Sequence, residues 1–399
     1  MHQIQSLTLH ALGRADDGTL IPRTLPGETV ERAPDGLVRI LTPSPDRVAP
    51  PCRHFRSCGG CAIQHASDAF VAGWKRDILA RALAGRGLAA EILGPETSPP
   101  QSRRRARFSA RRTKTGTLIG FHARASATII PIPECQLLTP ALMDSLPALD
   151  ALTRRAASRT AELAFTVTET LNGADILITA ERPLDPALHA DLTAIARDHR
   201  LARLTWNDDP VVTLAPPLQQ IGRARVLPPP GAFLQATADG QETLTRLVRD
   251  ALPDARRVAD LFAGCGTFAL PLAERADVHA VESDAAMLAA LDRGWRDTPG
   301  LHRVTTETRD LFRRPLDAAD LARFDAVVID PPRAGAEAQT AALAIARVPV
   351  IAMVSCNPVT FARDAAILVS AGFRLGPVTL VDQFRWSAHV ELVSRFTRD

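Results

Sequence analysis

The segment Val350-Ile351-Ala352-Met353-Val354-Ser355-Cys356-Asn357-Pro358 decides the fold, because an apolar run stops abruptly at a cysteine, an amide and a proline. The apolar residues predict a buried parallel strand, and Pro358 fits the first turn of a following helix. Open α/β sheets bind ligands at the carboxyl ends of their strands, so Cys356 is expected at a ligand-binding edge. Backbone dipoles at a helix N-terminus favour a thiolate, the nucleophilic form of cysteine. Cys356 is therefore a candidate nucleophile, and a small buried thiol without chemistry is the alternative.

The chain from Ala238 onward alternates between predicted strands and predicted helices. A helix runs to Leu252, and strands and helices then follow in turn down to two final strands at 375–381 and 389–396. This alternation predicts a doubly wound, mainly parallel sheet. Residues 229–399 are therefore assigned to a Rossmann-like α/β domain, which the run Pro228-Pro229-Pro230-Gly231 links to the preceding chain.

Two further domains are predicted before this linker. Residues 1–50 contain short alternating apolar runs separated by glycines, which predicts a small β module. Residues 51–228 are expected to form an α+β domain. Its predicted elements are, in order, a helix at 68–83, hairpins at 103–121 and 164–180, and a helix at 186–200. The second hairpin turns at Asn172-Gly173, a strong short-range hairpin signal.

The composition narrows the class of protein. The 399 residues are 46% hydrophobic, which is enough for two or three full cores. The sequence shows no secretory signal and no apolar run as long as a membrane span, so we expect a cytoplasmic protein without a membrane partner. The net charge of +3 means that binding to nucleic acid would depend on local patches of charge. No feature of the sequence indicates an obligate protein partner.

A second motif, Asp260-Leu261-Phe262-Ala263-Gly264-Cys265-Gly266-Thr267-Phe268, follows a predicted strand and opens a helix. Its glycines allow the backbone to approach a ligand closely. Glu282 ends the next strand, where a carboxylate can bind ribose hydroxyls. The third glycine of a dinucleotide fingerprint is absent, so the shorter Gly-x-Gly loop favours S-adenosylmethionine. An ordinary tight turn is the alternative.

Two further acidic positions are predicted at the same edge of the sheet. Asp330-Pro331-Pro332-Arg333 ends the strand before Cys356, and Glu391, in His389-Val390-Glu391, lies on the last predicted strand. Glu391 can supply a general base, although a lone glutamate on a strand is more often solvated. Both motifs are expected beside Cys356, and this shared position supports a functional role for them.

The cysteines and arginines before residue 140 form two more patterns. Three cysteines cluster at Cys52, Cys58 and Cys61, and Cys135 follows at a distance. Without a secretory signal, such cysteines are expected to bind a metal rather than to form disulfides. Zinc is the commoner partner of Cys-x-x-Cys, but three clustered ligands and one remote ligand are typical of iron–sulfur sites. The basic stretch 103–114 could pair with RNA phosphates or form a solvated strand face.

Taken together, these motifs resemble the RNA uracil-carbon-5 methyltransferase family, in its iron–sulfur branch that modifies 23S ribosomal RNA. The resemblance rests on Ser355-Cys356-Asn357-Pro358, Asp330-Pro331-Pro332-Arg333, His389-Val390-Glu391, Phe233-Leu234-Gln235 and the four cysteines. It implies an enzyme with Cys356 as nucleophile and Glu391 as base. The residues implied around S-adenosylmethionine and the target are Gln235, Phe262, Thr267, Glu282, Asp310 and Asp330. The resemblance also implies a 4Fe-4S cluster on Cys52, Cys58, Cys61 and Cys135.

The implied reaction begins when the Cys356 thiolate adds to carbon-6 of uracil and activates carbon-5 toward a methyl group. The uridine must leave the RNA stack to be reached, and ribosomal RNA is favoured over transfer RNA as substrate. Residues 1–50 resemble a shortened TRAM domain, which leaves the affinity of that module for RNA open. Other departures from the family pattern occur at Ala236-Thr237, Thr267 and Arg385-Trp386-Ser387.

Four other functions are compatible with parts of the sequence. A radical enzyme would leave one iron of the cluster open, and a cytosine methyltransferase would carry a second cysteine after Pro332, where Arg333 stands. Neither is favoured. The same chemistry on transfer RNA, and a non-catalytic iron–sulfur protein that binds RNA, remain as alternatives.

Overall fold

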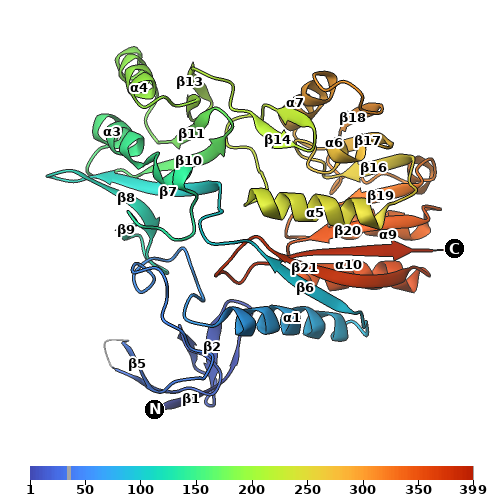
Figure 1. The fold of residues 1–399 in the computed structure, drawn as a ribbon, viewed down its shortest axis with the longest axis horizontal. Helices are drawn as coiled ribbons and strands as arrows, with labels where there is room; N and C mark the ends of the chain where they lie inside the picture. Colours follow the sequence, from blue (N-terminus) through green and yellow to red (C-terminus); the bar gives the residue numbers. More distant parts are fainter. Residues whose placement is uncertain (34–36, 399) are drawn as a thin grey trace.

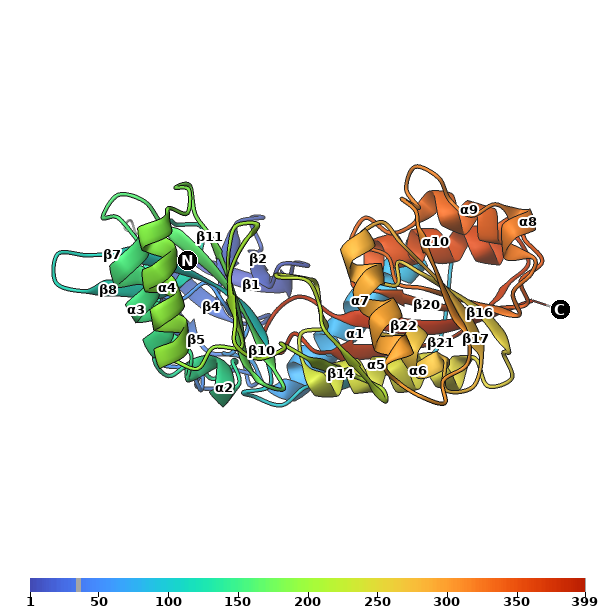
Figure 2. The ribbon, with the colours of Figure 1, turned by 90° about the horizontal axis from the view of Figure 1, so that it is seen from above.

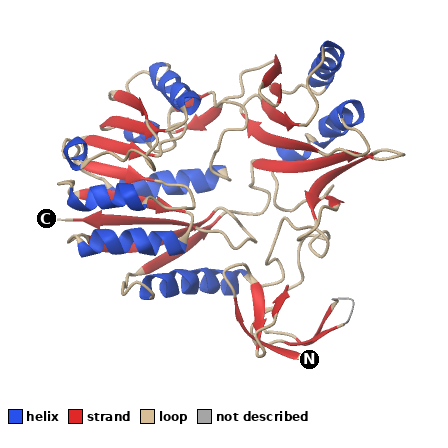
Figure 3. Ribbon diagram, turned by 180° about the vertical axis from the view of Figure 1, so that it is seen from behind, coloured by secondary structure: helices blue, strands red, loops and turns tan. Residues whose placement is uncertain are grey.

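The computed structural model describes residues 1–33 and 37–398. The chain forms a five-stranded, a seven-stranded and an eight-stranded sheet, together with a two-stranded hairpin. Figure 2 shows two lobes, with the C-terminal α/β layers in one and the two preceding sheets in the other. Loops run between the lobes, and the N-terminal sheet also lies beside the helix at 68–84 (Figure 3). No helix within residues 1–33 and 37–398 combines the length and the apolar character that crossing a membrane requires.

The eight-stranded sheet forms the centre of the C-terminal lobe (Figure 1). Its strands are, in spatial order, β18 (Val304–Thr308), β17 (Asp277–Glu282), β16 (Arg257–Leu261), β19 (Ala326–Ile329), β20 (Val350–Ser355), β22 (Glu391–Thr397), β21 (Arg374–Asp382) and β6 (Ile92–Thr97). β22 runs antiparallel to both of its neighbours, and the other pairings in this sheet are parallel.

Helices cover both faces of this sheet because successive side chains of its strands point to opposite sides. Ala352 of β20 packs into one core, whereas Ile351 and Met353 pack into the other. The first core is covered by α5 (Ala238–Ala251), α6 (Ala269–Leu272), α7 (Ala285–Arg296) and the hairpin of β14 (Gln219–Ile221) and β15 (Ala224–Val226). The second is covered by α1 (Asp68–Ala84), α8 (Ala318–Leu321), α9 (Glu337–Ile345) and α10 (Pro358–Ser370).

The predicted doubly wound sheet is confirmed, and the two predicted final strands are present as β21 and β22. Two strands of the sheet were missed. β18 is a mostly polar edge strand without an apolar alternation, and β6 lies far upstream and joins the sheet by pairing with β21. Residues 68–97 therefore contribute α1 and β6 to the C-terminal layers, while the domain boundaries at 50 and 228 stay a prediction.

The seven-stranded sheet belongs to the predicted α+β region. Its strands are, in spatial order, β13 (Asp209–Thr213), β12 (Arg203–Trp206), β11 (Gly173–Thr179), β10 (Leu163–Thr170), β7 (Arg105–Arg112), β8 (Thr117–His122) and β9 (Ile129–Pro131). Both predicted hairpins are present, as β7–β8 and β10–β11. The helices beside it are α2 (Pro140–Met143), α3 (Leu146–Ala156) and α4 (Pro186–Asp198). Asp185 caps α4 as expected, accepting from the Leu188 amide at 2.8 Å.

The N-terminal module is a five-stranded sheet, as predicted. Its strands are, in spatial order, β3 (Leu20–Pro22), β2 (Leu12–Ala15), β1 (His2–Leu7), β4 (Thr29–Arg32) and β5 (Val38–Thr42). A small core of Ile4, Ala15, Ile21 and Val30 lies inside it. A second cluster joins this module to Trp74 and Ile78 of α1, so the module packs on the helix that also covers the C-terminal sheet.

A buried ion pair fixes the end of β21 to helix α1. The Lys75 Nζ lies 2.6 Å from an Asp382 carboxylate oxygen and donates to the His389 carbonyl at 2.9 Å. Burial lowers the pKa of Lys75, and the Asp382 carboxylate acts in the opposite direction. Because Asp382 and His389 flank the loop between β21 and β22, this lysine holds the β21–β22 loop (residues 383–390) in place.

We expect Lys75→Met to lower the free energy of unfolding by about 3–5 kcal/mol, because it leaves a buried carboxylate without its counter-ion. Urea unfolding measures the change. Lys114→Met is the matched control, since Lys114 is exposed and is the other lysine of the chain. Removing both charges, in Lys75→Met/Asp382→Asn, should restore part of the loss. Equal stability of the Lys75 and Lys114 variants would contradict this role of the pair.

Candidate active site

Strand pairing places Cys356 and Glu391 beside each other at the carboxyl edge of the C-terminal sheet. β20 ends at Ser355, and Ser355 pairs with Leu392 of the antiparallel strand β22. The next residue at this edge is therefore Cys356 on one strand and Glu391 on the other. Glu391 is 4% exposed, whereas Cys356 is half-buried. The two residues predicted as nucleophile and base are thus brought together.

Asp330 adds a second carboxyl group beside Cys356. It follows β19, the parallel neighbour of β20, and its amide donates to the Leu261 carbonyl at 3.2 Å. Burial raises the pKa of the Cys356 thiol to about 12, the Glu391 and Asp330 carboxyls act in the same direction, and Arg333 opposes them. In the protein alone these effects act against the thiolate that the helix N-terminus is expected to favour.

Asn357 joins the two loops that surround Cys356. Its Oδ1 accepts from the Val359 amide at 3.1 Å and so caps α10. Its Nδ2 donates to the Arg333 carbonyl at 3.0 Å. These two bonds tie the end of β20 to the segment that follows β19.

Gln383 was not predicted, and it connects three parts of the site. Its Nε2 donates to Gln235 Oε1 at 2.6 Å and to Glu391 Oε1 at 3.3 Å. Its Oε1 accepts from the Ala236 amide at 2.7 Å. The Gln383 side chain is 1% exposed, so these bonds satisfy an otherwise costly buried amide. No sequence signal indicates this role, because a polar residue in a loop after a strand is ordinary.

The predicted cofactor loop lies at the same edge, between β16 and α6. Phe262, Gly264 and Gly266 have φ values of 65°, 56° and 92°, a region that favours glycine. Glu282 ends β17, and its Oε2 accepts from the Gly264 amide at 3.1 Å. The loop is therefore held against the next strand by the carboxylate that was predicted to bind ribose.

The remaining predicted residues flank this loop. Thr267 follows Gly266 and is half-buried. Asp310 follows β18 and accepts from the Phe312 amide at 2.9 Å. The Phe312 and Phe262 rings lie 5.5 Å apart, so the loop after β18 contacts the glycine loop. Gln235 lies before α5 and reaches the site through Gln383.

Buried carboxyl groups dominate the charge of this edge. Burial raises the pKa of Asp330 to about 7. Burial, together with the nearby Asp330, also raises the pKa of Glu391 and of Asp260 well above their ordinary values. A positively charged ligand would offset the unfavourable burial of these groups in their ionised form. The site therefore fits a cation such as the sulfonium of S-adenosylmethionine.

Comparison with known proteins agrees with this geometry. A family model described as tRNA (Uracil-5-)-methyltransferase matches residues 228–397. An uncharacterized RNA methyltransferase of Brucella suis is 46% identical over 98% of this chain and 97% of its own length. The 23S rRNA (uracil(1939)-C(5))-methyltransferase RlmD of Chromohalobacter salexigens is 34% identical over 95% of this chain and 84% of its own length. The chain belongs to the RNA uracil-C5 methyltransferase family. The resemblance drawn from the motifs is confirmed.

A solved structure of this family has the same fold. It is the crystal structure of the Pyrococcus abyssi tRNA (uracil-54, C5)-methyltransferase in complex with S-adenosyl-L-homocysteine. Its TM-score is 0.77 at 21% identity, and the comparison covers 100% of this chain and 99% of that one. The two chains therefore share their overall fold along the full length of this chain.

The four predicted metal ligands of this family member line one cavity. The residues around it include Cys52, Cys58, Cys61 and Cys135 and the apolar side chains Phe55, Phe121, Ile132 and Leu137. Burial raises the pKa of Cys61 to about 12 and also raises those of Cys58 and Cys135. Buried thiols of this kind fit a metal site, since a bound metal would keep them deprotonated. No three of these sulfur atoms, all in the described part of the chain, lie within 4.8 Å of one another.

The β21–β22 loop connects this cavity with the catalytic edge. Trp386 packs in the core that contains Cys58 and Cys135. Its carbonyl accepts from the Ala62 and Ile63 amides at 2.8 and 3.2 Å. The loop that carries Gln383 is thus attached to the segment that carries three of the four cysteines.

The first arginines of the predicted basic stretch (103–114) form hydrogen bonds inside the protein. Arg104 donates to the Gln235 carbonyl at 3.2 Å and to Gln241 at 2.8 Å, and it is buried. Arg105 donates to the Gly231 carbonyl at 2.9 Å. These arginines join the seven-stranded sheet to the C-terminal lobe rather than facing RNA.

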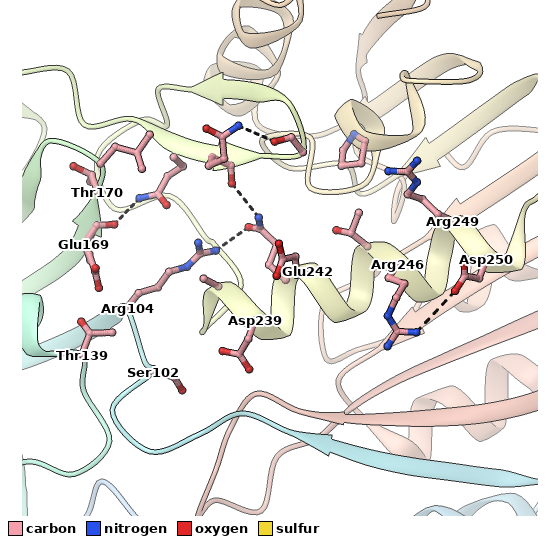
Figure 4. A pocket seen from close by; sticks show the side chains of 18 of the residues that line it. Ser102, Arg104, Thr139, Glu169, Thr170, Asp239, Glu242, Arg246, Arg249 and Asp250 are labelled. Carbon is pink, nitrogen blue, oxygen red and sulfur yellow. Dashed lines mark hydrogen bonds and ion pairs between the residues drawn. The ribbon is translucent and has the colours of Figure 1, made fainter.

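A separate cavity of about 930 Å³ lies between the seven-stranded sheet, the β14–β15 hairpin and α5. Figure 4 shows Arg104 pointing across it toward α5, with Glu242, Arg246 and Asp250 along that helix. Both signs of charge line this cavity, and none of the predicted site residues does. It is not assigned to the reaction.

Stability should depend on pH through Asp330. Because its pKa is raised from 3.8 to about 7 in the native state, the native protein keeps a proton that the unfolded chain releases. Stability is therefore lost as pH rises between these values. We expect Asp330→Asn to lack this loss, so its unfolding free energy relative to wild type should rise from about pH 4 to about pH 7. Urea titrations at both pH values, with the exposed Asp254→Asn as control, measure the difference. A difference that stays constant with pH would contradict this role of Asp330.

Proposed function

We propose that the protein transfers a methyl group from S-adenosylmethionine to carbon-5 of a uridine in RNA, through a covalent bond between Cys356 and the base. The observation that carries this proposal is the position of Cys356 beside Glu391 at an edge rich in buried carboxyls. S-adenosylmethionine, when bound, supplies an electrophilic methyl group on a positively charged sulfur. Membership of the uracil-C5 methyltransferase family supports the choice of base and atom.

The roles of the two residues follow from the chemistry of uracil. Carbon-5 is a weak nucleophile until the Cys356 Sγ bonds to carbon-6, which moves electron density onto carbon-5. Once carbon-5 carries the methyl group, Glu391 removes the remaining proton from it. The Sγ–C6 bond then breaks, and the C5–C6 double bond returns. Gln383 orients Glu391 for this step through its hydrogen bond.

We assign the cofactor to the edge formed by β16, β17 and β19. Glu282 would bind the ribose hydroxyls, because it ends β17 directly beside the glycine loop. Around the rest of the cofactor and the target base would lie Gln235, Phe262, Thr267, Asp310 and Asp330. Phe262 supports this assignment, because its positive φ turns the chain sharply at the end of β16.

We infer that the substrate is 23S ribosomal RNA. The relative named for that RNA is 34% identical over most of the chain, whereas the transfer RNA enzyme is 21% identical and shares the fold. To test this, the purified protein and labelled S-adenosylmethionine are incubated separately with 23S ribosomal RNA and transfer RNA from a strain that lacks the enzyme. Nucleoside analysis should find 5-methyluridine in the 23S RNA. Product in transfer RNA alone would reject this substrate, and product in neither would reject the function.

Replacing Glu391 should separate methyl transfer from product release. In Glu391→Gln, Cys356 can still bond to the base, but removal of the carbon-5 proton should slow by about 10² to 10⁴-fold. We expect a protein–RNA adduct that survives denaturing gels, carries label from the methyl group and is absent in Glu391→Gln/Cys356→Ala. Normal turnover, or inactivity without an adduct although RNA and cofactor bind, would show that Glu391 is not the base.

We propose that the four cysteines bind a 4Fe-4S cluster with a structural role. A single zinc ion with Zn–S bonds of about 2.3 Å would hold four sulfurs about 3.8 Å apart. Within the described residues, no three of the cysteine sulfurs come within 4.8 Å of one another. We favour the cluster because three of the ligands are clustered in the sequence and one is remote, a spacing typical of iron–sulfur sites. The role is structural because methyl transfer requires no electron transfer.

Protein purified without oxygen should be brown and contain about four irons per chain. Cys135→Ser should lose the colour, the iron and much of the soluble yield, since it removes one ligand of the cluster. Cys265→Ser is the matched control, because Cys265 is buried in the core of the C-terminal lobe and away from the cavity. Metal analysis and visible absorption measure the outcome. Stoichiometric zinc without iron would overturn the cluster assignment.

A further inference from the structure

Three arginines gather where three segments of the chain meet. Arg23 follows β3 of the N-terminal sheet, Arg56 lies in the cysteine loop (residues 52–65), and Arg124 lies in the turn between β8 and β9. We call them the junction arginines. The Arg23 guanidinium lies 5.7 Å from the centre of the Phe55 ring, so it lies against the cysteine loop next to Arg56.

The same loop packs closely against the turn that carries Arg124. The Gly59 amide donates to the His122 carbonyl at 2.9 Å, and Cys58 forms a β-bridge with Ala123. A Cβ atom at Gly59 would lie 2.7 Å from the His122 carbonyl oxygen, so this close approach requires glycine. The backbone therefore fixes the spacing between the cysteine loop and Arg124.

The junction arginines are not neutralised by the protein. In the described part of the chain, no carboxylate forms an ion pair with any of them, and the Nε atoms of Arg23 and Arg124 have no hydrogen-bond partner. Burial lowers the pKa of Arg23, and repulsion from the other two adds to this effect. Holding three like charges together is unfavourable unless an anion binds them.

Two other arginines in this region do have carboxylate partners. Arg47 forms an ion pair with the buried Glu28, and Arg53 forms one with Glu134 at 2.9 Å. Two arginines within the same part of the molecule thus have carboxylate partners, while the junction arginines lack them. The difference points to a ligand that supplies the negative charge.

We propose that the junction arginines bind phosphate groups of the RNA substrate outside the catalytic edge. This inference rests on the proposed function. Guanidinium groups bind phosphate oxygens through two parallel hydrogen bonds, and several phosphates of one strand can serve several arginines. Binding releases counter-ions from the RNA, so its strength depends on salt.

The position of the junction arginines agrees with an RNA strand that extends out of the active site. The cysteine loop carries a junction arginine and also donates two hydrogen bonds to the Trp386 carbonyl in the β21–β22 loop. His389, at the end of that loop, has positive neighbours from three parts of the chain. Burial lowers its pKa, and Arg333, Lys75, Arg103 and His10 add to the effect. The surroundings of His389 in this loop are therefore positively charged, and Arg23 gives the shortened N-terminal module a direct part in binding RNA.

The test measures binding of an unmodified 23S ribosomal RNA transcript to the full protein as a function of salt. The variants are Arg23→Gln, Arg124→Gln and their combination, chosen because neither residue belongs to the cysteine loop. Each substitution should lower the slope of log affinity against log salt by about 1 and weaken binding at low salt. The KM for RNA should rise, while kcat and the affinity for S-adenosylmethionine stay unchanged.

Two controls separate charge from damage to the fold. Arg347→Gln removes an exposed arginine that precedes β20, at the opposite end of that strand from Cys356, and should leave the slope unchanged. Arg124→Lys keeps the charge and should keep the slope. An unchanged slope in the double variant, with normal methylation by the wild type, would overturn this inference and leave the proposed function standing. Failure of the wild type to methylate either RNA would instead reject the function.

Discussion

The antiparallel insertion of β22 between β20 and β21 is the constraint on which the catalytic edge depends. A parallel strand brings its last residue to the carboxyl edge of a sheet, whereas an antiparallel strand brings its first. Glu391 is the first residue of β22, and Cys356 follows the last residue of β20. Because β22 is antiparallel, the Glu391 carboxyl at its start lies beside the Cys356 thiol at the end of β20. The register of that pairing fixes their separation more firmly than any loop could.

The β21–β22 loop is held by contacts with α1, with the cysteine loop and with the segment before α5. Lys75 of α1 holds both of its ends, the cysteine loop binds the Trp386 carbonyl, and Gln383 reaches Gln235 ahead of α5. These contacts are buried and polar, so each depends on the position of its partner. A displacement of the N-terminal or cysteine-bearing segments would thus reach Glu391 through this loop. The geometry explains why a methyltransferase sheet is combined here with two further modules.

Local patterns in the sequence were sufficient for the parts of the structure that depend on neighbouring residues. The strand, cysteine and proline at 350–358, the glycine loop after Asp260 and the turn at Asn172 all lie where the patterns predict them. The four cysteines and the predicted nucleophile and base could be named because motifs identified them, and the structure places the cysteines around one cavity and Cys356 beside Glu391.

Features that depend on distant residues could not be predicted in this way. β6 pairs with a strand almost three hundred residues later, and Gln383 has its partners in the segment before α5 and on β22. The pKa of Cys356 depends on burial and on the carboxyls of Glu391 and Asp330. The sequence next to Cys356, at the start of the following helix, does not predict these effects. Local sequence specifies the elements, whereas ionisation and hydrogen-bond partners arise from tertiary packing.

The pairing of β6 with β21 also has a consequence for how the protein is made. Without β6, strand β21 would present its unpaired backbone groups at the edge of the sheet, where another chain could pair with them. During synthesis β6 leaves the ribosome long before its partner β21. β20 and β21 cannot be joined in the sheet until β22 pairs with both of them. Contacts between such distant segments form slowly. The strand that joins β20 to β21 is the one that carries Glu391, so the edge with Cys356 and Glu391 cannot assemble until β22 has left the ribosome.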